Sequence, residues 1–290
     1  MKRVRFGFSP CPNDTVQFFA LVHGLIDTGE IVFEPVLEDV ETLNRMSLSG
    51  ELPMTKASYA VLGKVLPDYW CLRSGGALGR GCGPLWVSKG EKTAAELAAL
   101  PIAHPGENTT AHLLLSLRLG GRFTGVPMVF CEIMEAIERG EVASGVIIHE
   151  GRFTYEGRGL TAVEDLGEWW ERTTGAPIPL GAILLRRDSG LDPLHVEELL
   201  RKSLDYGRSH PKEVAEYVRE NAQELDDEVT ARHIALYVNE FSRDLGEEGE
   251  KAVLELLSRQ RKLGLIREWE GEVFALKAEP PPASKFRRMR

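Results

Sequence analysis

Residues 1–24, MKRVRFGFSPCPNDTVQFFALVHG, combine an apolar strand pattern at 4–8, a proline-containing turn at 9–15 and a helix pattern at 14–24. The same succession repeats through the first half of the chain. Further strands are predicted at 31–37, 53–55, 70–73, 84–88, 101–104, 128–131 and 145–148, and further helices at 40–48, 58–65, 94–97, 110–119 and 133–139. Alternating strands and helices of these lengths predict an α/β fold with parallel-rich sheets flanked by helices.

The second half of the chain has a different pattern. After a strand at 180–186, only helices are predicted, at 193–209, 211–221, 227–242 and 247–263. This layout predicts a large lobe formed by 1–88 plus 179–270 and a small lobe formed by 89–178, with the C-terminal helices packed on the first lobe. A cleft between two such lobes is a common site for a small ligand. Three successive prolines and a basic end predict a flexible tail at 271–290.

Composition excludes several classes of protein. The chain has 290 residues, 43% of them hydrophobic and 27% charged, which is typical of a folded globular protein. Its formal net charge of −9 argues against nucleic acid as a main partner. No apolar run reaches the ~18 residues of a membrane span, and no apolar signal-peptide core follows the N-terminus, so we expect a cytoplasmic protein. The 4 cysteines form no C-x-x-C pair, so neither a zinc site nor a disulfide is indicated.

Polar segments follow four predicted strands, at the sheet edge where open α/β folds bind ligands. These segments are 9–15 (SPCPNDT), 56–58 (KAS), 105–111 (PGENTTA) and 149–150 (HE). Asn13 or Asp14 is expected to cap the first helix, and the Thr109-Thr110 pair repeats this arrangement in the other lobe. Two helix N-termini and Lys56 would form a site for a carboxylate or a phosphate. The alternative is that these residues only cap helices.

His149 is the most specific candidate for chemistry, because it ends an apolar strand at the ligand-binding edge. An imidazole there titrates near neutral pH and can accept a proton from a substrate. The alternative is a structural histidine, and the six others show weaker signals because most lie in helical patterns: His23, His104, His112, His195, His210 and His233. Cys11 could be a nucleophile or could simply fill the turn. The glycine-rich run 75–83 lacks nucleotide-binding patterns and is interpreted as a turn near the hinge.

Several longer motifs occur together and in a fixed order, which is a specific signal. They are SPCPNDT (9–15), EDVETLN (38–44), TKASY (55–59), SGGALGRG (74–81), IIHEGRFTY (147–155), PLGAI (179–183) and YVN (237–239). With these motifs the chain resembles the 1,4-dihydroxy-6-naphthoate synthase family of the futalosine route to menaquinone, over about residues 4–265. The resemblance implies a two-lobed type II periplasmic-binding-protein-like fold. It also implies a carbon-carbon lyase that acts on cyclic dehypoxanthine futalosine, a small-molecule carboxylate, without a metal or an organic cofactor.

The resemblance also implies roles for individual residues. His149 corresponds to the general base of the family. The implied substrate-binding residues are Lys56, Ala57, Ser58, Thr110 and Ala111. We expect Ser9, Asn13 and Asn44 to bind the substrate as well. Two other functions remain open: the chorismate dehydratase of the same pathway, and a non-catalytic protein that binds small anions. Dimers are common among enzymes of this kind, so a homodimer also stays open.

Overall fold

The computed structural model describes residues 1–222 and 226–276 and contains two separate sheets, each of five strands. In spatial order, the strands of the first sheet are β2 (Ile31–Leu37), β1 (Lys2–Phe8), β3 (Met54–Ser58), β10 (Ile178–Arg186) and β4 (Tyr69–Gly79). β1 pairs in parallel with β2 and β3, whereas β10 runs antiparallel to both β3 and β4. The helices between these strands are α1 (Pro12–Val22), α2 (Val40–Leu48) and α3 (Tyr59–Val65).

The second sheet is mixed in the same way. Its strands, in spatial order, are β7 (Gly125–Pro127), β6 (Ile102–His104), β8 (Ser144–Ile147), β5 (Leu85–Lys89) and β9 (Leu160–Asp165). β6 pairs in parallel with β7 and β8, and β5 runs antiparallel to β8 and β9. Its helices are α4 (Ala94–Ala98), α5 (Thr110–Leu119), α6 (Ile133–Glu138), α7 (Gly151–Thr154) and α8 (Leu166–Thr174), with 3-10 turns η1 (Phe130–Glu132) and η2 (Glu156–Arg158). The fold class is α/β, as predicted.

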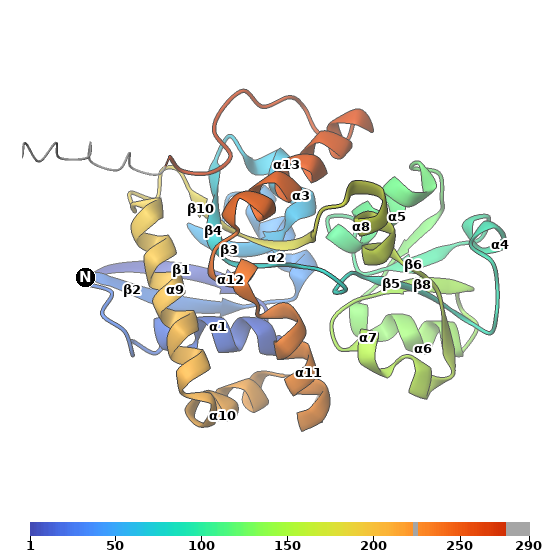
Figure 1. Ribbon diagram of the computed structural model, residues 1–290, viewed down its shortest axis with the longest axis horizontal. Coiled ribbons are helices and arrows are strands. Elements are labelled where there is room, and N and C mark those ends of the chain that lie inside the picture. The colour runs from blue at the N-terminus through green and yellow to red at the C-terminus, as the bar shows by residue number, and fades with distance from the viewer. Residues whose placement is uncertain (223–225, 277–290) are drawn as a thin grey trace, which may run out of the picture.

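The two sheets lie side by side, and the chain crosses between them twice, from β4 to β5 and from α8 to β10 (Figure 1). The predicted lobe boundary at 88/89 falls inside β5, a strand that pairs only within the second sheet. The division of the chain into lobes at these positions stays a prediction. Residues 277–290 of the predicted tail lie outside the described part of the chain. Within the described part, Phe274 and Ala275 are buried, and the N–H of Cys71 donates to the carbonyl of Val273.

The C-terminal helices are α9 (Pro193–Ser209), α10 (Pro211–Asn221), α11 (Asp227–Tyr237), α12 (Glu240–Arg243) and α13 (Gly246–Lys262). α9 packs on α1 and β4, and α13 packs on α3 and β10, so these helices cover the first sheet (Figure 1). The single helix predicted at 227–242 is wrong. Asn239 caps α12 by accepting from the N–H of Phe241 and forms a capping box with Ser242, and this separates α11 from α12.

Two other predictions are corrected by the structure. The glycine-rich run 75–83 is largely strand, because β4 continues to Gly79. At Gly75, φ is +85° and an added Cβ would lie 2.8 Å from Ile183, so glycine lets β4 pack closely on β10. Residues 128–131 do not form a strand, because β7 ends at Pro127 and η1 follows. The sequence analysis predicts no strand or helix at 160–174, where the structure has β9 and α8.

Apolar side chains fill the space between each sheet and its helices. In the first half, Phe6, Phe8 and Phe18 are fully buried, and their ring centroids lie 4.8–5.1 Å apart. Along β1, Arg3 and Arg5 are exposed, whereas Phe6, Gly7 and Phe8 are all buried, so the end of the strand is covered on both faces. None of the helices in the described ranges is long and apolar enough to cross a membrane.

Candidate active site

The turn between β1 and α1 is organised around Asp14 rather than around a helix cap. The backbone N–H and the hydroxyl of Ser9 donate to Asp14 Oδ2 over 3.1 and 2.8 Å, and Asn13 Nδ2 donates to Asp14 Oδ1 over 2.6 Å. The N-cap of α1 is Cys11, without a side-chain hydrogen bond, and Pro12 occupies the first helical position. The prediction that Asn13 or Asp14 caps α1 is therefore wrong, because Pro12 starts the helix earlier.

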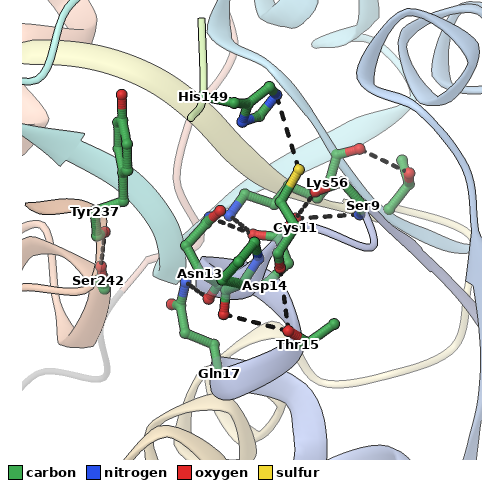
Figure 2. Close-up of polar contacts among 12 residues, drawn as sticks. Ser9, Cys11, Asn13, Asp14, Thr15, Gln17, Lys56, His149, Tyr237 and Ser242 are labelled. Atoms are coloured by element: carbon green, nitrogen blue, oxygen red, sulfur yellow. Dashed lines mark hydrogen bonds and ion pairs between the residues drawn. The ribbon is translucent and has the colours of Figure 1, made fainter. Parts of the chain in front are cut away.

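Lys56 lies at the centre of the site but does not present an uncompensated charge. Its ammonium group forms an ion pair with Asp14 Oδ1 (Figure 2), and the two side chains are only 9% and 2% exposed. Asp14 thus accepts hydrogen bonds from Ser9, Asn13 and Lys56 together. An anionic ligand would therefore meet a neutral pair at this position, and its attraction would depend mainly on other donors.

Asn44 fixes Ser58 from the neighbouring helix. Asn44 Oδ1 accepts from the N–H of Ser58 over 2.7 Å, and Asn44 Nδ2 donates to the Ser58 hydroxyl over 3.0 Å. The same Nδ2 group donates to the carbonyl of Asn108 over 3.1 Å, which belongs to the loop after β6. Asn44 therefore positions a candidate ligand-binding residue. It also links the two halves of the molecule, by which we mean the part built on the first sheet and the part built on the second.

The N-terminus of α5 supplies the donors of the second half. Thr109 is its N-cap and accepts from the N–H of His112, while the Thr110 hydroxyl donates to the carbonyl of Leu180 over 2.8 Å. Thr110 and Ala111 are the first two helical residues, and their N–H groups have no hydrogen-bond partner among the residues that the structure describes. Such groups, together with the helix dipole, favour a carboxylate or a phosphate.

His149 follows β8 and has an unusual backbone conformation. Its φ of 55° is positive, which within residues 1–222 and 226–276 occurs at no other position except glycines. The half-buried ring lies with Nε2 4.0 Å from Cys11 Sγ (Figure 2), and its centroid is 5.0 Å from that of Phe130. Burial lowers the pKa of His149, and the carboxylates of Glu150 and Asp14 only partly oppose this effect. The imidazole is therefore neutral at neutral pH and able to accept a proton.

His233 is part of the site although its sequence pattern gave no sign of it. It is fully buried on α11, and its ring stacks on that of His149 with centroids 6.0 Å apart and planes at 13°. Because Asn13 Nδ2 donates to Asp14, Asn13 Oδ1 is the acceptor for His233 Nε2–H, over 2.9 Å. Burial lowers the pKa of His233, so it is neutral, and its Nδ1 lies 3.5 Å from Glu150 Oε1 without a hydrogen bond.

Cys11 does not have the properties of a nucleophile. Burial raises the pKa of its thiol far above the usual range, and the Glu150 carboxylate makes a second, smaller contribution in the same direction. The thiolate is therefore disfavoured. All four cysteines are free thiols. Nowhere in the described ranges do three or more His, Cys, Asp or Glu side chains gather as a metal site would require.

The candidate residues meet in one cavity between the two sheets, which encloses about 730 Å³ of empty space including its mouth. Every predicted site residue except Asn44 lines it. Its wall also includes Cys82, Leu180 and Tyr237, for which the sequence suggests no specific role. A neutral imidazole at such a cavity, with helix N–H donors across from it, can remove a proton from a bound organic acid.

Contacts between α2 and the loop after β6 hold the two halves together. Glu41 on α2 accepts from the side chain of Asn108 over 2.8 Å and from its backbone N–H over 3.2 Å. Beside this contact, Gly106 has a φ of +131°, and an added Cβ would lie 2.5 Å from Glu41. Only glycine therefore lets the loop after β6 approach α2 this closely.

Comparison with known proteins gives consistent matches. Residues 4–262 match the model of a family described as "Menaquinone biosynthesis". The 1,4-dihydroxy-6-naphthoate synthase of Thermus thermophilus is 52% identical over 266 residues, 91% of this chain and 96% of that protein. A crystal structure from Archaeoglobus fulgidus has a TM-score of 0.85 and 34% identity, covering 91% of this chain and 98% of that one. The periplasmic aliphatic sulphonate binding protein of Escherichia coli, at 13% identity and a TM-score of 0.64, covers 92% of this chain and 94% of its own and shows the fold alone.

Proposed function

Because the chain belongs to the menaquinone biosynthesis family, we propose that it is a 1,4-dihydroxy-6-naphthoate synthase, the activity named for its Thermus thermophilus relative. Its substrate would be cyclic dehypoxanthine futalosine, as the motifs of the sequence imply. The observation that carries the proposal is the position of His149, a neutral imidazole at a cavity lined from both halves of the molecule. A protein that only binds solutes has no need of a base there.

The cavity suggests a role for each of its polar groups. The substrate carboxylate would bind to the N–H groups of Thr110 and Ala111 and to the hydroxyl of Ser58, since these donors line one cavity. His149 would remove a proton from the substrate, and negative charge would develop on an adjacent oxygen. Loss of the sugar-derived fragment would then leave the aromatic naphthoate, so aromaticity supplies part of the driving force.

The other groups of the site would act by positioning. The pair of Lys56 and Asp14 would place Ser9 and Asn13 at the cavity wall, and Asn44 would hold Ser58. The proposed reaction needs no metal or organic cofactor, because a base and hydrogen-bond donors are sufficient for it. We place this reaction in the cytoplasm, in line with the expectation from the sequence.

The test is multiple turnover by the purified protein. Cyclic dehypoxanthine futalosine and chorismate are supplied separately, and formation of the fluorescent naphthoate is followed for the first and dehydration for the second. We expect many turnovers with the first substrate and none with the second. Turnover of chorismate instead, or binding without turnover, would overturn the assignment in favour of the dehydratase or of a binding protein.

A second measurement tests the base. His149→Ala is expected to lower kcat by about 10² to 10⁴, the usual contribution of a placed general base. The matched control is His195→Ala, an exposed histidine on α9 outside the cavity, which should leave kcat unchanged. Wild-type turnover by His149→Ala would show that another group accepts the proton.

A further inference from the structure

Tyr237 is a cavity residue that the proposed roles leave unused. It is the last residue of α11 and lies one helical turn after His233. Its side chain is 8% exposed and lines the same cavity as His149 and Ser58. Its ring centroid is 4.7 Å from that of His233, which in turn stacks on His149. Two ring contacts therefore link Tyr237 to the proposed base.

The hydroxyl of Tyr237 has no hydrogen-bond partner within the part of the chain that the structure describes. The other hydroxyls at the cavity have protein partners: Ser9 donates to Asp14, Thr109 to the carbonyl of Gly106 and Thr110 to that of Leu180, and Ser58 accepts from Asn44 Nδ2. Figure 2 shows the Tyr237 hydroxyl pointing away from Ser242. Because Tyr237 lines the cavity and its hydroxyl has no protein acceptor among the described residues, the hydroxyl is free to donate to an acceptor on a bound ligand.

The protonation state of Tyr237 suits a donor. Burial raises the pKa of its hydroxyl well above the usual range, with a further contribution from the nearby Cys82 thiol. The hydroxyl therefore keeps its proton throughout the pH range in which an enzyme works. It does not act as a general acid. It would act by hydrogen bonding alone.

We propose that the Tyr237 hydroxyl donates a hydrogen bond to the substrate oxygen that gains negative charge when His149 removes the proton. This inference rests on the proposed function. That oxygen is bonded to the carbon beside the one that loses the proton, so its donor must open on the same cavity as the base, and Tyr237 and His149 both line that cavity. The carboxylate at the α5 N-terminus is a different group of the same substrate, held by the N–H donors of Thr110 and Ala111.

Tyr237→Phe tests the proposal, because it removes only the hydroxyl and keeps the ring packed on His233. A donor to developing charge acts mainly in the transition state, so we expect kcat to fall by about 100-fold with KM nearly unchanged. The control is Tyr59→Phe, since the Tyr59 hydroxyl likewise has no hydrogen-bond partner in the described ranges but is buried away from the cavity. Tyr59→Phe should keep wild-type kcat, and both variants should keep the wild-type melting temperature.

The outcomes separate this inference from the function on which it rests. If the wild-type protein forms no naphthoate, the proposed function and the inference fail together. If the wild type turns over and Tyr237→Phe loses less than about tenfold in kcat, or changes only KM, the inference alone fails. A larger loss in kcat, absent from Tyr59→Phe, supports it.

Discussion

The buried pair of Asp14 and Lys56 allows a quantitative test of how the site is held together. Asp14→Asn keeps the size of the side chain but removes its charge. In the native protein the two carboxylate oxygens accept from Lys56, from Asn13 and twice from Ser9. An asparagine offers one oxygen and one NH₂ group, so some of these donors would face another donor. Lys56 would also lose the carboxylate that compensates its charge.

The size of the effect follows from burial. The side chains of Lys56 and Asp14 are 9% and 2% exposed, so water cannot replace the lost partner. Removing one member of such a pair costs about 3 to 5 kcal/mol in the free energy of unfolding. At roughly 2 to 4 °C for each kcal/mol, the melting temperature should fall by on the order of 10 °C. Differential scanning calorimetry of the wild type and the variant measures this directly.

A double variant separates charge from shape. Asp14→Asn combined with Lys56→Met removes both charges, and the apolar chain of methionine fills the space of the lysine stem. Most of the lost stability should return, because a neutral buried pair needs no partner charge. A single variant within about 1 kcal/mol of the wild type would refute the reasoning, as would a double variant less stable than Asp14→Asn.

Two other predictions concern the chemistry and the contact between the halves. Since burial lowers the pKa of His149 below its ordinary value of 6.5, kcat/KM should stay level as the pH falls to 6.5 and decline only at lower pH. A kcat/KM value that has already fallen to half of its maximum at pH 6.5 would contradict this. Gly106→Ala would push Glu41 away from Asn108, so substrate should bind about tenfold more weakly through two lost hydrogen bonds. Calorimetric titration measures this binding when each protein also carries His149→Ala, which prevents turnover. In that background Gly120→Ala, with φ +64° but no atom within 4 Å of the added Cβ, should bind normally.

Much of the fold could be predicted because local patterns agree with the final packing. β2, α2 and α5 have the predicted bounds, 31–37, 40–48 and 110–119. α5, for example, buries the apolar residues Ala111, Leu113, Leu114 and Leu115. The wrong predictions occur where tertiary contacts determine the conformation of a segment. The strand conformation of the glycine-rich run depends on its pairing with β10, which lies a hundred residues further along the chain.

The candidate site shows the same division. The sequence places Ser58, Thr110 and His149 after strands, and the structure brings all three to one cavity. The sequence could not show that Asp14 neutralises Lys56, because the contact between these two residues depends on how β1 and β3 pair. Nor could it single out His233, since a histidine in an amphipathic helix gives the same pattern whether it faces solvent or Asn13. No local signal distinguishes these cases.

The protonation state of His149 depends on the contact between the two halves. His149 belongs to the half built on the second sheet, whereas Cys11 and His233, which cover its ring, belong to the half built on the first. Separation of the halves would return water to the imidazole and bring its pKa back toward the ordinary value. Closure would remove that water and so favour the neutral form, which is the form a base requires. The contacts of Glu41 and Asn44 with Asn108 therefore stabilise the arrangement in which His149 is both aimed at the cavity and able to accept a proton.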